Sequence, residues 1–375
     1  MMMAALFISF ILFSFIIDSG GPIGIRMLSL GIVFCMGTWN FFFKRKKIDI
    51  YFFISVFFLL VFSVIGFISA AVNGIDASAA YIWVLPVVSV PVFYFFFISF
   101  SSENLVKGVV YTGWIFSVVI LVTFFSLYFF GESSVSIIQS YELPGWFYIR
   151  PDGYPQVYFQ ATLVLVLITI YSYFQGFKKS AFVFCFILLM CLSRFGFSTS
   201  VAFILLGAIG WILYIRKYIT SIFIFQSAFF LIACLVMYLQ VGMDYVMDGS
   251  GFHIRQGHLI SIFNTMSLDN LIIGMGPGSE VYSIGFEKLT DNIEISQLEL
   301  IRKYGFLGYF IYTIALFFML TSFVKKEKFA EAYAIYGFYI ASYSNPVLLS
   351  FSFSVFAGCF LAINARELKN KNDGV

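Results

Sequence analysis

Long apolar runs separated by short polar segments make up most of the chain. Runs of about 20 residues match the roughly 30 Å hydrocarbon core of a bilayer. In lipid the backbone must satisfy its own hydrogen bonds, so each run should be a helix. The pattern predicts about twelve spans, at residues 2–17, 23–43, 50–72, 81–100, 109–130, 156–175, 180–193, 197–215, 219–240, 296–323, 329–345 and 346–364.

The composition excludes a soluble protein. The 375 residues are 61% hydrophobic and 11% charged, whereas soluble domains are roughly 45–50% apolar. The first run lacks a basic leader and a small-residue cleavage site, so we expect it to be a retained helix. The five cysteines all fall in apolar runs, and we interpret them as small hydrophobic core residues. We therefore expect an all-α polytopic membrane protein, with residues 1–375 forming a single integral membrane domain.

The basic residues predict how the chain is oriented, because lysine and arginine favour cytoplasmic loops. With twelve spans, the basic segments 44–47, 178–179, 216–217 and 325–328, together with Lys107 and the C-terminal tail, all fall on one side. That side is expected to be the cytoplasm, and both termini lie there too. Two long loops, 131–155 and 241–295, are then expected on the outer side.

The sequence offers no sign of a nucleotide or metal site. No phosphate-binding loop lies on the cytoplasmic side, and neither GxSxG nor SxxK occurs. His253 and His258 are five residues apart and do not share a helix face, and no cysteine or acidic cluster completes a metal site. We expect no cofactor, no metal and no nucleic-acid partner.

Several arginines fall on the expected outer side, where topology favours few basic residues: Arg150, Arg194, Arg255 and Arg302. Arginine presents a rigid fork of donors suited to phosphate or carboxylate. The set predicts an anionic ligand at the outer surface. The alternatives are pairing with nearby acids or extension to lipid headgroups. For Arg302, an ion pair with Glu299 three residues earlier is the plain alternative.

The long outer loop has three features of interest. Residues 252–270 form an amphipathic pattern, with Ile254, Leu259, Ile262, Phe263 and Met266 on one helical face. This predicts a helix that lies on the bilayer or caps the bundle.

Next, Gly274, Gly276 and Gly278 surround Pro277 in a turn whose amides could hold an oxyanion or sugar hydroxyls, or which is only a turn. Finally, Glu294 stands at the junction with the next span. It could be a general base or a carboxylate at a helix start.

In the shorter outer loop, aromatic residues stand beside Arg150: Trp146, Phe147, Tyr148 and Tyr154. The loop also contains Glu142 and Asp152. Such a set suits a sugar-binding surface, because sugar C–H faces stack on rings. An aromatic belt at the membrane interface would give the same composition.

Together these features resemble the O-antigen polymerase and ligase family. The resemblance rests on the many spans, Arg255 in a late outer loop, the Gly274–Gly278 turn, and Leu298-Glu299-Leu300-Ile301 leading to Gly305-Phe306-Leu307-Gly308. The Ser-Arg turn at 193–196 also resembles the family. The resemblance implies a glycosyltransferase acting on undecaprenyl-pyrophosphate-linked oligosaccharides at the periplasmic face of the bacterial inner membrane. It also implies that Arg194 and Arg255 hold the pyrophosphate, with His253 and His258 secondary.

Within that family the sequence favours a polymerase. Ligases have a His-Asn pair ahead of the last motif, and Glu294-Ile295 stands at that point here. The resemblance therefore makes Glu294 the expected base. A chain-length regulator and a flippase are possible protein partners. The remaining alternatives are an O-antigen ligase and a lipid-linked oligosaccharide flippase, although flippases tend to have short loops and two similar halves.

Overall fold

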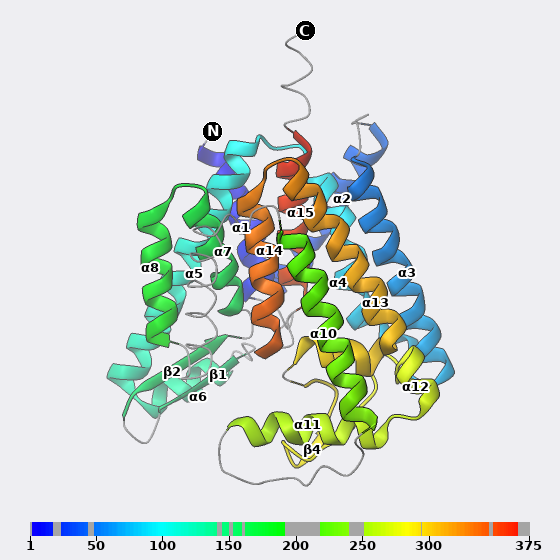
Figure 1. Cartoon of the computed structure of the whole chain (residues 1–375). Coiled ribbons are helices and arrows are strands. Elements are labelled where there is room, and N and C mark those ends of the chain that lie inside the picture. Colours follow the sequence, from blue (N-terminus) through cyan, green and yellow to red (C-terminus); the bar gives the residue numbers. More distant parts are fainter. Residues whose placement is uncertain are drawn as a thin grey trace.

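The computed structural model is a bundle of helices with roughly aligned axes (Figure 1). It describes residues 2–17, 24–43, 49–140, 145–149, 153–159, 162–191, 218–239, 251–293, 295–344 and 348–366. The bundle helices are α1 (Met2–Ile17), α2 (Ile25–Phe43), α3 (Ile50–Val72), α4 (Ala77–Phe97), α5 (Ser102–Phe130), α7 (Thr162–Phe174), α8 (Lys178–Cys191), α10 (Ile219–Leu239), α13 (Ser296–Lys325), α14 (Phe329–Ala341) and α15 (Phe351–Arg366).

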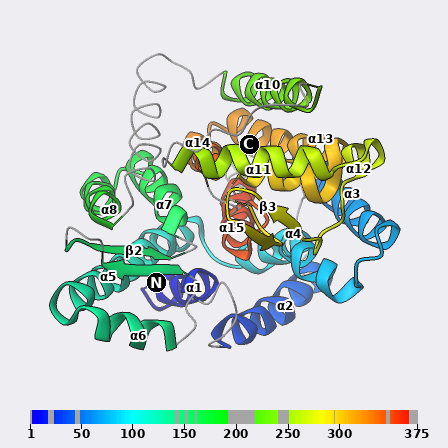
Figure 2. The ribbon, with the colours of Figure 1, turned by 90° about the horizontal axis from the view of Figure 1, so that it is seen from below.

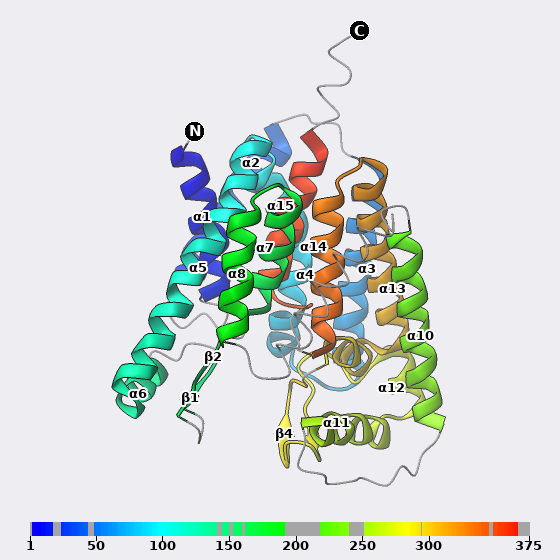
Figure 3. The same ribbon diagram turned by 60° about the vertical axis from the view of Figure 1, so that its left-hand side comes forward.

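The remaining elements gather at one end of the bundle, which we call the cap end (Figures 1 and 3). They are α6 (Glu132–Ser140), α11 (Gly251–Thr265), α12 (Leu268–Ile273) and two antiparallel hairpins, β1 (Gly145–Ile149) with β2 (Pro155–Phe159) and β3 (Val281–Ser283) with β4 (Lys288–Thr290). α1 begins and α15 ends at the opposite end (Figure 1).

The helices fit a membrane. Five of them, α2, α3, α4, α5 and α13, are long and apolar enough to cross one, and shorter apolar helices occur in α1, α7, α10 and α15. Large apolar side chains such as Trp39, Phe53 and Phe129 lie exposed on the outside of the bundle. In water this surface would be unfavourable, whereas lipid tails match it. The chain is therefore a mostly helical, membrane-embedded protein, as the apolar pattern predicts.

Polar residues set several helix starts. Asp49, Asp76 and Ser101 cap α3, α4 and α5 by accepting hydrogen bonds from main-chain N–H groups of the first turn. α4 and α5 consequently begin before the apolar runs predicted at 81–100 and 109–130. In the polar first turns of α5, the Lys107 ammonium lies 2.7 Å from the Glu103 carboxylate, an i,i+4 pair that suits a helix.

The predicted span 156–175 is wrong at its start, because residues 155–159 are strand β2 and the helix begins only at Thr162. Alternating burial explains the strand: Val157 and Phe159 are buried, and the Phe159 ring meets the Phe147 ring of β1 at 4.9 Å. Near the C-terminus, α14 ends at Ala341 rather than residue 345, and α15 begins at Phe351 rather than 346. The predicted span 197–215 lies outside the described residues.

Side chains hydrogen-bonded to backbones join helices that are distant in sequence. α13 packs along α3, where Ser55 Oγ donates to the carbonyl of Ala315 at 2.9 Å. α15 packs against α4 and α1, where Ser352 Oγ donates to the carbonyl of Phe15 at 2.8 Å. Small polar residues allow this close approach inside a membrane bundle.

At the end opposite the cap, Asp49 joins three helices. Its carboxylate accepts from Ser322 Oγ at 2.8 Å and pairs with the ammonium of Lys326. Asn364 of α15 in turn donates to Ser322 Oγ at 2.7 Å. Partial burial raises the pKa of Asp49, but hydrogen bonds from Lys326, Ser322 and the Tyr51 N–H outweigh it and hold that pKa below its ordinary 3.8.

Candidate functional site

The cap end contains the described parts of the two predicted outer loops, 131–155 and 241–295. α11 runs across the end of the bundle, as the view from below shows (Figure 2). Ile262, Phe263 and Met266 are buried, which agrees with the predicted amphipathic face. The glycine turn at 274–278 follows α12 and lies beside the first part of α13, and the β3–β4 hairpin follows the turn.

Helix α13 is broken at Gly305, where the backbone adopts φ 69° and ψ −178°. The break leaves carbonyl groups near it without partners inside the helix. The amide of Met275 donates to the carbonyl of Arg302 at 2.7 Å, and the amide of Gly276 donates to that of Lys303 at 3.1 Å. An unsatisfied carbonyl at membrane depth costs several kcal/mol. The glycine turn therefore supplies the hydrogen bonds that the break removes.

Two glycines make this contact possible. A side chain on Gly274 would overlap the backbone carbonyl of Lys303, and one on Gly305 would overlap that of Ile272. Both glycines also have positive φ, 86° and 69°, which residues with a Cβ rarely adopt. Glycine is required at both positions by space and by conformation.

The other two glycines of the turn also serve packing. Gly276 lies against the backbone of Ala70, and Gly278 lies against the side chain of Ala79. These contacts place the turn against α3 and the start of α4. Gly276 and Gly278 were expected to bind substrate, and the structure gives them a separate role in positioning the turn.

The expectation that the turn exposes its amides is wrong for three residues. The amide of Gly274 donates to the carbonyl of Asn270 at 2.7 Å, and those of Met275 and Gly276 donate to α13. The sequence pattern could not reveal this, because the broken helix α13 lies next to the turn only in the folded chain. Its carbonyl groups accept hydrogen bonds from amides of the turn that a ligand would otherwise use.

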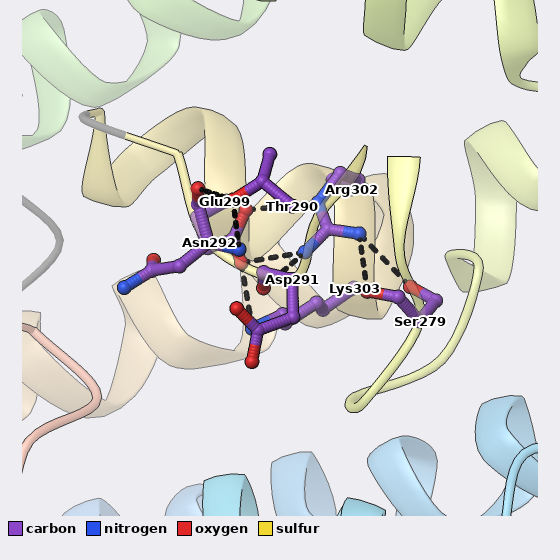
Figure 4. Close-up of polar contacts among 7 residues, drawn as sticks. All are labelled: Ser279, Thr290, Asp291, Asn292, Glu299, Arg302 and Lys303. Atoms are coloured by element: carbon purple, nitrogen blue, oxygen red, sulfur yellow. Dashed lines mark hydrogen bonds and ion pairs between the residues drawn. The ribbon is translucent and has the colours of Figure 1, made fainter. Parts of the chain in front are cut away.

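Arg302 lies at the centre of a buried polar cluster (Figure 4). Its Nε and Nη2 donate to the two oxygens of Glu299 at 2.9 and 2.7 Å. Nη1 donates to the carbonyl and hydroxyl of Ser279 at 2.8 and 3.0 Å. The second bond from Nη2 goes to the carbonyl of Asp291 at 2.7 Å. These bonds tie the hairpin segment to the first turns of α13.

The expected role of Arg302 in holding a substrate is therefore wrong. A guanidinium has five N–H donors, and protein oxygens accept all five here. No donor remains for a ligand. The plain alternative, the ion pair with Glu299, is what the structure contains.

Lys303, the next residue, also falls on the expected outer side, but the sequence suggested no role for it. Its ammonium lies 2.6 Å from Glu299 Oε1 and against the face of the Trp83 ring, and its side chain is fully buried. Two cations therefore share one carboxylate. The signal was available, because Glu299 and Lys303 are four residues apart in a helix and so share a face.

α11 is attached to the β3–β4 hairpin by polar bonds. His258 Nδ1 and Ser283 Oγ lie 2.7 Å apart, and Ser261 Oγ accepts from the amide of Ile284 at 2.8 Å. Gly257 approaches the backbone of Gly285 so closely that a side chain would overlap it. His258 is fully buried. Its bond to Ser283 makes it a link between helix and hairpin, whereas the sequence suggested a residue that faces substrate.

The aromatic residues that the sequence places beside Arg150 differ in exposure in the β1–β2 hairpin. Tyr148 and Tyr154 are exposed, while Phe147 is buried. The Tyr154 hydroxyl donates to the carbonyl of Met190 at 2.7 Å, which anchors the hairpin to α8. Tyr148 is thus exposed on the hairpin, Tyr154 anchors it and packs against Phe124, and Phe147 belongs to the core.

The other predicted site residues are only partly described. The backbones of His253 and Arg255 lie in α11, and that of Trp146 lies in β1, so these residues belong to the cap end. Their side chains are outside the described part of the structure, as are residues 150, 194 and 294 in full.

Two further observations complete the site. Within the described ranges, no group of three His, Cys, Asp or Glu side chains is arranged to hold a metal ion. No family model, curated protein or solved structure matches the chain.

Proposed function

We propose that this chain is a membrane glycosyltransferase that polymerises surface polysaccharide. It would join oligosaccharide repeat units carried on undecaprenyl pyrophosphate, at the periplasmic face of a bacterial inner membrane. One observation carries the proposal. The Gly274–Gly278 turn and the Leu298–Gly308 segment, two separate parts of the resemblance to O-antigen polymerases and ligases, pack directly on each other at the cap end. α11, which contains Arg255, lies at the same end.

The proposed topology has about twelve spans, cytoplasmic termini and a periplasmic cap end. It is supported by the distribution of basic residues. Lys107, Lys178 and Lys325 lie near the ends of α5, α8 and α13 that are opposite the cap (Figure 1), and positive residues favour the cytoplasmic side.

A matched pair of glutamates tests the topology. Glu287 at the cap end and Glu327 at the other end are both exposed, and both have positive φ, 53° and 58°. Cysteine introduced at Glu287 should react with a membrane-impermeant maleimide added to cells whose outer membrane is permeabilised. Cysteine at Glu327 should react only after the inner membrane is opened. The reverse labelling would overturn the proposed orientation.

The proposed mechanism needs neither a nucleotide nor a metal. Glu294 removes the proton from the acceptor hydroxyl, whose oxygen bonds to the anomeric carbon of the donor sugar. The bond from that carbon to the diphosphate breaks, and undecaprenyl pyrophosphate leaves with the electron pair. Arg194 and Arg255 stabilise the charge that develops on it. Arg150 and the aromatics of the β1–β2 hairpin, including Trp146, would hold the sugar chain.

One observation favours a second candidate, a flippase. The break of α13 at Gly305 is a discontinuous helix of the kind found in transporters. Here, however, the glycine turn already satisfies carbonyls at the break, so they are not left to bind a substrate. A ligase is a third possibility within the same family resemblance.

The test is deletion of the gene in its own bacterium, followed by analysis of the surface polysaccharide on a gel. A polymerase predicts collapse of the ladder to the core plus one repeat unit. Complementation with Arg255→Ala, Arg194→Ala or Glu294→Gln should then fail although each variant inserts normally. Lys288→Gln, at an exposed residue of β4, is the matched control and should restore the ladder.

Other results would assign other functions. Long lipid-linked chains accumulating outside, with no repeat-bearing lipopolysaccharide, would mean a ligase. Single repeat units stranded at the cytoplasmic face would mean a flippase. An unchanged ladder would overturn all three.

A further inference from the structure

The buried cluster at the start of α13 has more positive than negative charge. Glu299 pairs with both Arg302 and Lys303, and the side chains of these three residues are 2%, 0% and 0% exposed. Charged groups at membrane depth are costly and are normally balanced by a partner. Among the described residues, one cation of this cluster has no carboxylate of its own.

Lys303 is the cation that remains available. Arg302 uses all of its donors on protein oxygens. In the described part of the chain, the Lys303 ammonium pairs with one oxygen, Glu299 Oε1, and lies against the Trp83 ring, whereas an ammonium has three N–H donors. Asp291 attracts it electrostatically, but that side chain is exposed and no ion pair joins the two. Lys303 therefore retains N–H donors in a low-dielectric site.

Trp83 covers this ammonium. The face of its ring lies against Lys303 Nζ, and the side chain is partly exposed although Lys303 is not. Trp83 lies near the start of α4, at the cap end, where the glycine turn also packs.

We propose that Lys303 binds an anionic group of the substrate, the diphosphate, and that Trp83 moves to admit it. This deepens the proposed function and rests on it. Phosphate oxygens would accept the unused N–H donors, and the negative charge would balance the second cation of the cluster. Because water is excluded, each of these contacts would be stronger than at an exposed lysine such as Lys288.

The test is ligand binding to the purified full-length protein in nanodiscs. The probes are farnesyl diphosphate and inorganic pyrophosphate, with farnesol as the uncharged control. We expect both diphosphates to raise the melting temperature of the wild type and of Lys288→Gln, and farnesol to leave it unchanged. Lys303→Gln should weaken the binding of both diphosphates at least tenfold. Absence of diphosphate binding to the wild type, or equal affinity in Lys303→Gln, would overturn the inference.

Stability without ligand separates binding from a structural role. Lys303→Gln leaves Glu299 and Arg302 as a matched pair, so the ligand-free melting temperature should stay the same or rise. A lower melting temperature together with unchanged diphosphate affinity would show that Lys303 is only structural. Trp83→Ala should speed pyrophosphate association several-fold, whereas Trp39→Ala, on the outer surface of α2, should not. An unchanged rate would remove Trp83 from the proposal.

Experiments can refute the Lys303 site and the polymerase function independently of each other. Lys303-dependent diphosphate binding with an unchanged polysaccharide ladder would refute the polymerase and keep the binding site. A ladder that collapses on deletion, with diphosphate affinity that does not depend on Lys303, would refute this site alone.

Discussion

Gly274 and Gly305 allow the glycine turn and α13 to make close backbone contact, because neither residue has a side chain that would keep the two segments apart. Gly274 lies against the carbonyl of Lys303, just before the break in α13, and Gly305 at the break lies against the carbonyl of Ile272, just before the turn. Each glycine leaves the space that the other segment's backbone occupies. The contact joins the turn to α13 where the helix loses its own hydrogen bonds.

Substitution of either glycine by alanine should be strongly destabilising. The new methyl group would overlap backbone and force a positive φ on a residue with a Cβ, at a combined cost of about 3 kcal/mol. We expect Gly274→Ala and Gly305→Ala to lower the thermal inactivation temperature in detergent and to reduce the amount of folded protein. Gly176→Ala is the control, because Gly176 also has positive φ but no atom within 4 Å of its Cβ position. Its cost should be only about 1 kcal/mol, and equal losses at all three positions would contradict the packing argument.

Arg302 should be essential for folding. Arg302→Gln would leave Ser279 and the carbonyl of Asp291 without their donors and Glu299 with Lys303 alone, at a cost of about 3 kcal/mol. Arg302→Lys should not rescue the protein, because an ammonium cannot reproduce the planar fork. The double variant Glu299→Gln/Arg302→Gln should lose less than the sum of the single variants, as measured by thermal unfolding. Strict additivity, or a folded Arg302→Gln that has lost only activity, would argue for a role in substrate binding.

Asp49 should make stability depend on pH at the end opposite the cap. Because the folded pKa is below the ordinary 3.8, its contribution is complete above that value and is lost as the pH falls through the folded pKa. Asp49→Asn should lower stability on the order of 1 kcal/mol at pH 7, and the gap from wild type should close in acid. The measurement is the melting temperature of both proteins between pH 7 and pH 3.

Asp76→Asn is the matched control for that experiment. Asp76 also caps a helix, but its bonds are local, and its pKa is lowered by the hydroxyl and amide of Ser78. Asparagine caps a helix about as well as aspartate, and Asp76 is exposed, so the gap between this variant and the wild type should be smaller than that of Asp49→Asn at pH 7 and should also close in acid. A gap between Asp49→Asn and wild type that stays constant down to pH 3 would rule out titration of Asp49 as the cause.

Ser261 should hold the β3–β4 hairpin against α11. Ser261→Ala leaves the partly buried amide of Ile284 without its acceptor, at a cost of about 1–3 kcal/mol. We expect faster hydrogen exchange at Ile284 and faster proteolysis in the turn 284–287, with the helices of the bundle unaffected. Thr265→Ala removes a hydroxyl that bonds only within α11 and should leave the hairpin protected. Equal protection in both variants would show that Ser261 does not hold the hairpin.

Much of the helical bundle follows from local properties of the chain. The ends of α1, α3 and α10 lie within a residue of the predicted runs, because hydropathy and polar caps act over a few residues. The β1–β2 hairpin was missed, because an apolar strand pairing with another strand has the same local hydropathy as the first turn of a membrane helix. The break at Gly305 was missed for a similar reason, since a glycine within an apolar run is common in membrane helices.

The sequence by itself determined that the chain is a membrane-embedded helical protein, where most helices lie, and which segments form the cap end. These depend on hydropathy and charge, which are sums over neighbouring residues. The tertiary structure alone decided which polar groups are already used. Partners within the protein already bond to Arg302, to His258 and to the amides of Gly274, Met275 and Gly276. Lys303 keeps unused donors. A donor is available to a ligand only if no acceptor distant in sequence reaches it first, and that depends on how the chain packs.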